Sequence, residues 1–277
     1  MTSFRDLHYG ERPLVLPNAW DYASAAALAA RGFVAVGTTS LGVAAAAGKP
    51  DGTAATRDET VDLARRLQRL PCLVSVDIEG GFSEDPDEVA DLVAELAALG
   101  VVGVNVEDGR PDGTLTPLDH QLSVIGGIKS RVPELFVNAR TDTHWQRRPT
   151  PAALEEALRR AREFADAGAD GVFVPGVTGD AAIGALVEMA GVPLNVLFVP
   201  GLDLDRLAAL GVRRVSTGSL LFRAALTAAV ETAAAVASGG AVTKAALTAA
   251  VETAVAVSGG SAVTKDLVSY GEVQALN

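Results

Sequence analysis

Residues Cys72–Glu107 read CLVSVDIEGGFSEDPDEVADLVAELAALGVVGVNVE, and this stretch contains the unit from which the fold is built. An apolar run at Cys72–Val76 leads to a helical pattern over Pro86–Leu99, which Gly100 ends, and a second apolar run follows at Val101–Val106. Proline at a helix start and glycine at a helix end are the usual boundary signals. The stretch therefore predicts a strand, a helix and a second strand that lies parallel to the first.

The same unit recurs along most of the chain. Further predicted strands are Leu14–Leu16, Phe33–Val36, Leu135–Ala139, Gly171–Val174, Leu194–Phe198 and Arg213–Ser216. Further predicted helices lie near Asp21–Arg31, Arg57–Arg69, Leu118–Arg131 and Pro151–Ala167, and a Gly/Ala loop is expected after Phe33–Val36. Eight units in about 235 residues match a closed barrel better than an open sheet, and no strand precedes a dinucleotide or Walker A loop. We therefore predict the α/β class, as a (β/α)8 TIM-type barrel with extra C-terminal helices.

Composition restricts the classes of function. The chain has 277 residues, with 23 Lys and Arg against 34 Asp and Glu, and a sequence pI near 4.8. An acidic chain lacks the clustered cations that neutralise phosphates, which argues against nucleic-acid binding. One cysteine excludes a disulfide scaffold. The N-terminus has no apolar signal-peptide core and no charge-free apolar run reaches about 18 residues, so we expect a cytoplasmic protein without a membrane span.

The C-terminal part carries a tandem duplication. Residues 224–244 read AALTAAVETAAAVASGGAVTK and residues 245–265 read AALTAAVETAVAVSGGSAVTK, which differ at four positions. We expect two domains, a barrel over 1–222 and a helical tail over 223–277. Each copy predicts a helix broken by Gly-Gly, and both are apolar on most faces. We expect these helices to bury against a neighbour, within the chain or in an oligomer.

Polar side chains follow three successive predicted strands at the points where the strands end. Residues two apart lie on the same face of a strand. The pairs are Asp77 and Glu79, Asn105 and Glu107, and Asn138 and Arg140. In a barrel this face is the interior mouth at the carboxyl ends of the strands, where active sites lie. Charges there need a metal, a substrate or one another, because unpaired buried charge is costly.

These side chains favour a metal site with a neighbouring cation. The carboxylates Asp77, Glu79 and Glu107, without histidine or cysteine, form a hard oxygen site that suits Mg²⁺ or Mn²⁺ better than zinc. Arg140 has the fork geometry that binds a carboxylate or a phosphoryl group. The alternative is an internal salt-bridge network without a ligand.

Other candidate positions have competing explanations. Gly37–Ser40 could present backbone N–H groups to an anion or form a plain loop. Asp51 lies in a turn-like stretch, and Asn195 faces the mouth or a neighbouring backbone group. Gly218–Ser219 could bind phosphate or cap a helix. Cys72 is expected in the core, and the three histidines adjoin no obvious triad.

At these residues the chain resembles the isocitrate lyase/phosphoenolpyruvate mutase superfamily. The matching stretches are Pro17–Asp21 (PNAWD), Gly37–Ser40 (GTTS), Asp77–Gly81 (DIEGG), Asn105–Asp108 (NVED) and Asn138–Asp142 (NARTD). The resemblance covers most of residues 10–225, and Ser269–Val273 (SYGEV) looks like the usual C-terminal end of the superfamily.

The resemblance implies a barrel that binds Mg²⁺ and a 2-oxo acid, and that forms or breaks a bond next to a pyruvate enolate. Carried over by position, Asp77 would bind the metal directly, Glu79 and Glu107 would hold the metal's waters, and Asp51 would lie nearby as a catalytic group. Thr39 and Ser40 would contact the substrate carboxylate. Arg140 would neutralise the enolate, and Asn195 would line the pocket. The resemblance also implies homodimers or homotetramers with swapped helices.

The chain departs from the superfamily pattern in the loop after the fourth strand. Isocitrate and methylisocitrate lyases carry a catalytic cysteine there, and the mutase branch carries lysine and asparagine, whereas this loop reads EDGRPDGT over Glu107–Thr114. Pro175-Gly176 stands where the lyases have a glutamate after the sixth strand. The general acid is therefore not identified from the sequence.

The leading hypothesis is a Mg²⁺-dependent carbon–carbon bond lyase that acts on a small 2-oxo or 2-hydroxy di- or tricarboxylate through an enolate. One alternative is a phosphonopyruvate-type P–C mutase or hydrolase. The other is a member that binds 2-oxo acids without turnover. The expected partners are the carboxylate substrate and further copies of the chain, with no nucleic acid and no membrane.

Overall fold

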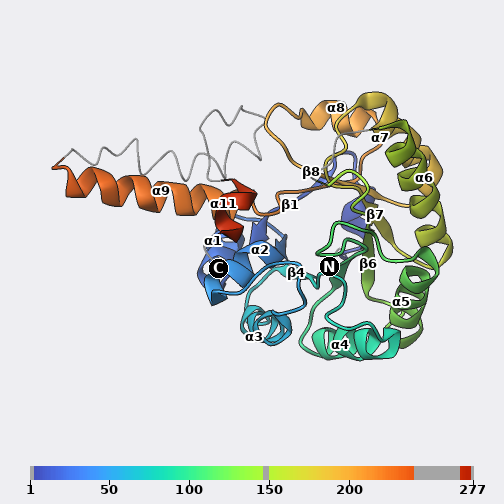
Figure 1. Cartoon of the computed structure of the whole chain (residues 1–277), viewed down its shortest axis with the longest axis horizontal. Coiled ribbons are helices and arrows are strands. Elements are labelled where there is room, and N and C mark those ends of the chain that lie inside the picture. Colours follow the sequence, from blue (N-terminus) through green and yellow to red (C-terminus); the bar gives the residue numbers. More distant parts are fainter. Residues whose placement is uncertain (1–2, 146–149, 240–268, 276–277) are drawn as a thin grey trace.

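A ring of parallel strands surrounded by helices forms the body of the molecule (Figure 1). The computed structural model describes residues 3–145, 150–239 and 269–275. Within these ranges the strands are β1 Leu14–Leu16, β2 Asn18–Ala19, β3 Ala35–Thr38, β4 Leu73–Asp77, β5 Gly103–Glu107, β6 Phe136–Arg140, β7 Gly171–Phe173, β8 Leu194–Leu197 and β9 Arg214–Ser216. Their order is β1-β9-β8-β7-β6-β5-β4-β3-β2, and every pairing is parallel. The predicted TIM-type barrel is confirmed.

The first predicted strand is split in two. Pro17 separates β1 from β2, and it has no backbone N–H to donate. The carbonyl of Pro17 accepts a hydrogen bond from the N–H of Gly37 at 2.8 Å. Because β1 pairs with β9 and β2 pairs with β3, the two short strands share one position of the barrel and bring its two edges together.

Helices lie outside the ring in chain order. Their bounds are α1 Tyr22–Ala30, α2 Ser40–Ala47, α3 Arg57–Leu67, α4 Pro86–Ala98, α5 Leu118–Arg131, α6 Pro151–Asp166, α7 Asp180–Ala190, α8 Leu204–Ala209, α9 Leu220–Ala237 and α11 Tyr270–Gln274, with a 3₁₀ helix η1 at Asp6–Tyr9. The prediction of a Gly/Ala loop after Phe33–Val36 is wrong, because residues Ser40–Ala47 of this segment form α2. The alanines of α2 are strong helix formers, and Gly48 ends the helix in the left-handed conformation at φ 66°.

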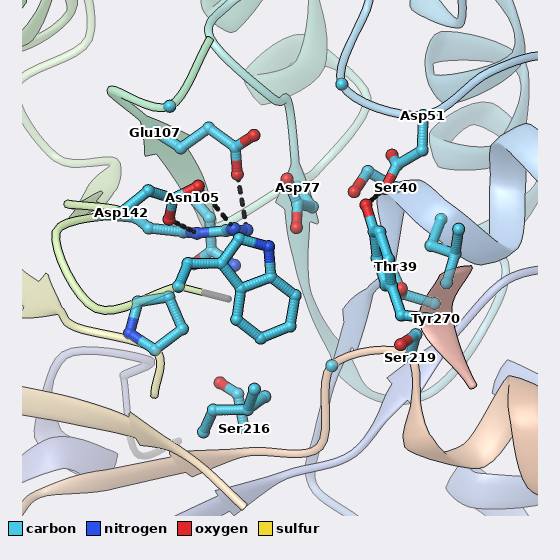
Figure 2. A pocket seen from close by; sticks show the side chains of 18 of the residues that line it. Thr39, Ser40, Asp51, Asp77, Asn105, Glu107, Asp142, Ser216, Ser219 and Tyr270 are labelled. Atoms are coloured by element: carbon cyan, nitrogen blue, oxygen red, sulfur yellow. Dashed lines mark hydrogen bonds and ion pairs between the residues drawn. The ribbon is translucent and has the colours of Figure 1, made fainter. Parts of the chain in front are cut away.

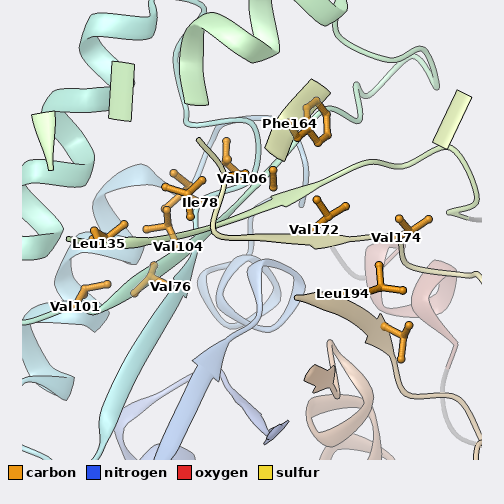
Figure 3. Close-up of a cluster of buried hydrophobic side chains, with 14 of the residues drawn as sticks. Val76, Ile78, Val101, Val104, Val106, Leu135, Phe164, Val172, Val174 and Leu194 are labelled. Carbon is orange, nitrogen blue, oxygen red and sulfur yellow. The ribbon is translucent and has the colours of Figure 1, made fainter. Parts of the chain in front are cut away.

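The apolar face of the strands packs against the helices (Figure 3). Val76, Ile78, Val104 and Val106 are fully buried, as the alternation within β4 and β5 predicts. The opposite face, inside the barrel, is polar. There Asn105 accepts a hydrogen bond from Asn138 at 2.9 Å and another from Arg214 at 3.1 Å. The barrel interior is therefore a hydrogen-bonded layer beneath the carboxyl ends of the strands.

An aromatic cluster covers the end where the strands begin. The His8 ring of η1 stacks on Phe136, the first residue of β6, with centroids 4.2 Å apart, and Phe4 meets Phe136 edge-on. His8 is 1% exposed, and its Nδ1 lies 2.9 Å from the carbonyl of Phe4. Burial, together with the charge of Arg214, lowers the pKa of His8 from 6.5 to about 4.

This histidine predicts a loss of stability in acid. Between about pH 6.5 and pH 4 the unfolded chain binds a proton at His8 that the folded chain does not, so the free energy of unfolding should fall with pH by about 3 kcal/mol. Urea unfolding at several pH values would measure the slope. His8→Gln should be less stable at pH 7 but should show a flatter slope. Equal slopes in the two proteins would contradict the assignment.

The helix α9 extends away from the barrel (Figure 1). Its first turn is buried, and Phe222 meets Trp20 edge-on, whereas Val230 and Val236 are each 62% exposed. The first duplicated copy is helical from Ala224 to Ala237, and the second copy, 245–265, lies outside the described residues. Among the described residues, a single helix, α9, is long enough and apolar enough to span a membrane, judged by length and composition alone. The expected absence of a span and the two-domain division remain predictions.

Candidate active site

A cavity of about 590 Å³ opens at the carboxyl ends of the strands (Figure 2). Six of the predicted site residues line it, namely Thr39, Ser40, Asp51, Asp77, Glu107 and Arg140. They come from the ends of β3, β4, β5 and β6 and from the segment that follows α2. A pocket of this size accommodates a small carboxylate together with ordered water.

Arg140 is held at the end of β6 by two carboxylates. Its Nη1 lies 2.5 Å from an oxygen of Glu107, its neighbour in register on β5. Its Nε and Nη2 bond the two oxygens of Asp142 at 2.6 and 3.0 Å. The guanidinium also lies 5.5 Å from the centroid of Trp145 and 5.8 Å from that of Phe173. These contacts fix the plane of the fork, while Nη1 and Nη2 each carry a second hydrogen that can bind a ligand.

The charges of this group perturb one another. Although burial alone lowers the pKa of Arg140, Asp142 and Glu107 raise it well above its usual value. Burial raises the pKa of Glu107 well above its ordinary range, against the opposing effect of Arg140. The salt-bridge network that was the alternative to a metal site is thus present around Arg140, and among the described residues it does not include Asp77.

The Asp77 carboxylate differs from Glu107 and Asp142 in its contacts. None of the ion pairs among the described residues includes it, and its Oδ1 accepts only the N–H of Glu79, at 3.2 Å. Burial raises the pKa of Asp77 to about 6, against Arg140 and with a contribution from Asp51. Figure 2 shows Asp77 between Glu107 and Asp51, facing the same space. Burial of this carboxylate costs free energy unless a positive charge balances it or it takes up a proton.

Asp51 carries one bonded and one unbonded carboxylate oxygen within the described part of the chain. Its Oδ2 accepts a hydrogen bond from the hydroxyl of Tyr270 at 2.5 Å, whereas its Oδ1 is buried and accepts none from the described residues. In residues 3–145, 150–239 and 269–275, no three histidine, cysteine or acidic side chains lie close enough to hold a metal by themselves. The carboxylate oxygens of Asp77 and Asp51 are of the kind that a hard cation such as Mg²⁺ prefers.

Two predicted residues lie outside the cavity wall. The oxygens of Glu79 accept hydrogen bonds from the Ala54 N–H at 2.9 Å and the Thr56 hydroxyl at 2.8 Å. Burial raises the pKa of Glu79 to about 7. Asn195 is fully buried and exchanges hydrogen bonds with Ser216 at 3.0 and 3.1 Å, so Ser216 lines the cavity in its place.

The N-terminal ends of two helices border the cavity. Thr39 and Ser40 begin α2, and Ser219 precedes α9. The first N–H groups of a helix lack partners within it and attract anions. Asn18 ties these two ends together, because its amide donates to the Thr38 carbonyl at 2.7 Å and its oxygen accepts the N–H of Gly218 at 2.9 Å. The N–H groups of Gly37 and Thr39 donate to the carbonyls of Pro17 and Ala19, at 2.8 and 3.0 Å, so the anion site suggested for Gly37–Ser40 remains a prediction that rests on the start of α2.

The loop after β5 is anchored by a buried ion pair. Asp108 is fully buried and accepts the Arg160 Nη1 at 2.9 Å and the Asp142 N–H at 2.9 Å. Burial raises the pKa of Asp108 to about 6. A bridge between Gly109 and Leu115 closes the loop, which brings Arg110 to the cavity wall. Arg110 also pairs with Glu84, at 3.4 Å.

Several residues of the site were not assigned roles from the sequence. They are Asn18, Arg110, Asp142, Trp145, Phe173, Tyr270 and Gln274. Asp142 could have been inferred, because it follows Arg140 by two residues in a stretch already singled out. Tyr270 lies in the stretch Ser269–Val273 that the resemblance singled out, but its role could not be inferred there, since its partner Asp51 lies 219 residues away in the chain.

Comparison with known proteins agrees with this architecture. The family model for phosphoenolpyruvate phosphomutase matches residues 4–237. An uncharacterized protein of Mycobacterium tuberculosis (strain CDC 1551 / Oshkosh) is 47% identical over 84% of this chain and 88% of its own length. The 2-methylisocitrate lyase of Salmonella typhimurium is 31% identical over 69% of this chain and 68% of its own length.

A solved structure shows the same fold. The crystal structure of a proposed phosphonomutase from Burkholderia cenocepacia J2315 superposes with a TM-score of 0.78 at 37% identity, over 84% of this chain and 97% of that one. The fold and site thus define a TIM-barrel protein with an acidic, metal-compatible mouth. The chain belongs to the isocitrate lyase/phosphoenolpyruvate mutase superfamily, whose members are lyases and mutases.

Proposed function

We propose that the protein is a Mg²⁺-dependent lyase that breaks a carbon–carbon bond in a small 2-oxo or 2-hydroxy di- or tricarboxylate through an enolate. The observation that carries the proposal is the Asp77 carboxylate, which makes no ion pair with the described residues and shares a cavity with Arg140 and with an Asp51 oxygen that those residues leave unbonded. Three carboxylates around one space, beside a fixed guanidinium, suit a cation and an anionic substrate together.

The metal would be held by Asp77, with Glu107 and Asp51 positioned to accept hydrogen bonds from its waters. When bound, Mg²⁺ supplies Lewis acidity that stabilises negative charge on the substrate's ketone oxygen. Mn²⁺ has the same preference for oxygen ligands and could substitute.

The chain's own residues supply the remaining interactions. The free hydrogens of Arg140 would bind the oxygen that becomes negative as the bond breaks, and the guanidinium is already oriented by Glu107 and Asp142. The N-terminus of α2 at Thr39 and Ser40 would bind the substrate carboxylate. Ser216 lies on the wall where Asn195 was expected to contact the substrate.

A second candidate has its own support. The matching family model describes phosphoenolpyruvate phosphomutase, and the 37% identical structure is a proposed phosphonomutase. This favours P–C bond chemistry on phosphonopyruvate as the alternative. The lysine and asparagine of the mutase loop are replaced here by the segment around Arg110 and Pro111, which is why the lyase is preferred.

Two NMR experiments test the proposal. Proton NMR would follow a panel of 2-oxo and 2-hydroxy di- and tricarboxylates with Mg²⁺, with EDTA as the control; the lyase predicts release of a pyruvate-like or glyoxylate-like product. Phosphorus NMR with phosphonopyruvate would detect the alternative. Mg²⁺-dependent binding of a 2-oxo acid by calorimetry, without turnover of any compound, would instead indicate a binding protein.

We also propose that the protein is cytoplasmic and self-associates as a homodimer or homotetramer. The support is the apolar surface of α9, on which Val230 and Val236 are exposed in the single chain. Light scattering of the purified chain tests this, since a monomer at micromolar concentration would contradict it.

A further inference from the structure

The C-terminal helix α11 reaches into the cavity from the far end of the sequence. Ser269, Tyr270 and Gln274 line the cavity, and α11 packs against α2. The Tyr270 hydroxyl donates to Asp51 Oδ2 at 2.5 Å. Figure 2 shows Tyr270 beside Asp51, on the side of the cavity opposite Glu107.

Gln274 holds the backbone of the same aspartate. Its side-chain oxygen accepts the Asp51 N–H at 3.3 Å, and its amide nitrogen lies 3.4 Å from the Asp51 carbonyl. The same amide donates to the Tyr270 hydroxyl at 3.3 Å. Asp51 lies in a turn between α2 and α3, so no helical or strand hydrogen bonds fix it. Its side chain and its backbone are therefore both positioned by two residues of α11.

The same helix contacts the aromatic ring beside Arg140. Tyr270 meets Trp145 edge-on with centroids 5.6 Å apart, and the Arg140 guanidinium lies 5.5 Å from the Trp145 centroid. A capping box at Ser269 and Glu272 sets the start of α11, with hydrogen bonds of 2.7 and 3.1 Å. The helix thus touches both the acidic and the cationic side of the cavity.

We propose that α11 is a clamp that completes the active site, in which Tyr270 and Gln274 are positioning residues that hold Asp51 with its free oxygen directed into the cavity. One carboxylate oxygen is occupied by the phenol, so the other is left to accept a hydrogen bond from the ligand or from a metal-bound water. Without the clamp, the turn would have to be ordered during each binding event, at a cost in conformational entropy. The catalytic consequence rests on the lyase proposed above.

The structural half of the proposal is tested without any activity. Hydrogen–deuterium exchange of the segment 48–53 should quicken several-fold in Tyr270→Phe and in Gln274→Ala, because each variant loses a bond to Asp51. Tyr270→Phe keeps the ring that packs on Trp145, so the effect isolates the hydroxyl. Gly271→Ala is the matched control on α11, since a methyl group there meets no atom within 4 Å. Unchanged exchange in both variants would overturn the clamp.

The functional half is tested by kinetics. Tyr270→Phe and Gln274→Ala should each lower kcat by about 10- to 100-fold, the range seen when partners that orient metal-site groups are removed. Their double variant should lose less than the product of the single losses, because both act through Asp51. Gln274→Asn keeps an amide, but its shorter side chain would not reach Asp51. The kcat of Gln274→Asn should therefore be as low as that of Gln274→Ala. Tyr9→Phe, at an exposed tyrosine, is the control that should leave kcat unchanged.

The outcomes separate the two proposals. If the wild-type protein turns over no carboxylate but the exchange result holds, the lyase is wrong and the clamp stands. Binding can also be measured by titrating the tryptophan fluorescence, to which Trp145 contributes, with Mg²⁺ and oxalate, a planar analogue of an enolate. Tyr270→Phe should weaken the apparent affinity for oxalate by about tenfold. Full wild-type kcat in both variants, together with wild-type oxalate affinity, would overturn the catalytic role of α11.

Discussion

Replacing Asp77 with asparagine should abolish Mg²⁺-dependent turnover and at the same time make the metal-free protein harder to unfold. The two effects have one cause, because Asp77 is an enclosed carboxylate with no ion-pair partner among the described residues. Asparagine removes the charge that a cation would neutralise, so kcat should fall about a thousandfold or more, which corresponds to a loss of about 4 kcal/mol. Without metal, the same change removes the cost of burying the charge and the repulsion from Asp51, which together outweigh the lost attraction to Arg140, and so should raise Tm.

Steady-state kinetics measures the expected fall in kcat, and calorimetry measures the expected rise in Tm. Wild-type Tm should rise with Mg²⁺ and fall with EDTA, whereas the Asp77→Asn protein should show no response to either. Asp58→Asn is the matched control, since its side chain is 88% exposed and it should change neither quantity. If Asp77→Asn retained Mg²⁺-dependent turnover, or if it lowered Tm in EDTA, the role assigned to Asp77 would be wrong.

Replacing Arg140 with lysine should lower kcat by about 100- to 1,000-fold with little loss of stability. Lysine keeps the charge that balances Glu107 and Asp142, but it cannot bond both oxygens of Asp142 and still offer a fixed donor to the substrate. Arg140→Met, by contrast, leaves two buried carboxylates unpaired and should destabilise the fold by about 3–5 kcal/mol. The pair of variants therefore separates geometry from charge.

Kinetics and urea unfolding of both variants measure the difference. Arg162→Lys is the control, because Arg162 bonds Asp166 at 2.8 Å on the exposed surface of α6. A fall in kcat for Arg140→Met without loss of stability would show that Glu107 and Asp142 are satisfied by other groups. Wild-type kcat in Arg140→Lys would remove Arg140 from the mechanism.

The barrel was predictable because its signals are local. Period-2 alternation placed Val76 and Ile78 against the helices and Asp77 towards the interior, and the structure agrees. The same reasoning fails at Glu79 for a physical reason. The strand β4 ends at Asp77, and Glu79 adopts a left-handed conformation with φ 51°, so its side chain turns to Ala54 and Thr56 instead of the cavity.

Other features depended on interactions that no short stretch encodes. The split of the first strand follows from Pro17 and from two different strand partners, which only the closed ring provides. The helix α2 was missed because its eight residues are apolar or small throughout and show no period. The contacts of Tyr270 with Asp51 and Trp145 join opposite ends of the chain, so they required the three-dimensional structure.

The pairing of Glu107 with Arg140 across β5 and β6, and of Asn105 with Asn138 one step below, has a consequence for how this protein can evolve. If the register between these strands shifted by one residue, the side chain of Arg140 would point outward into the apolar layer. Glu107 and Asp142 would then lose their ion pairs with it. Misfolded registers are thus rejected by the same charges that would bind the substrate. New specificities should therefore arise more readily by exchange of loop residues such as Arg110 than by changes at the strand ends, where each substitution disturbs assembly and chemistry together.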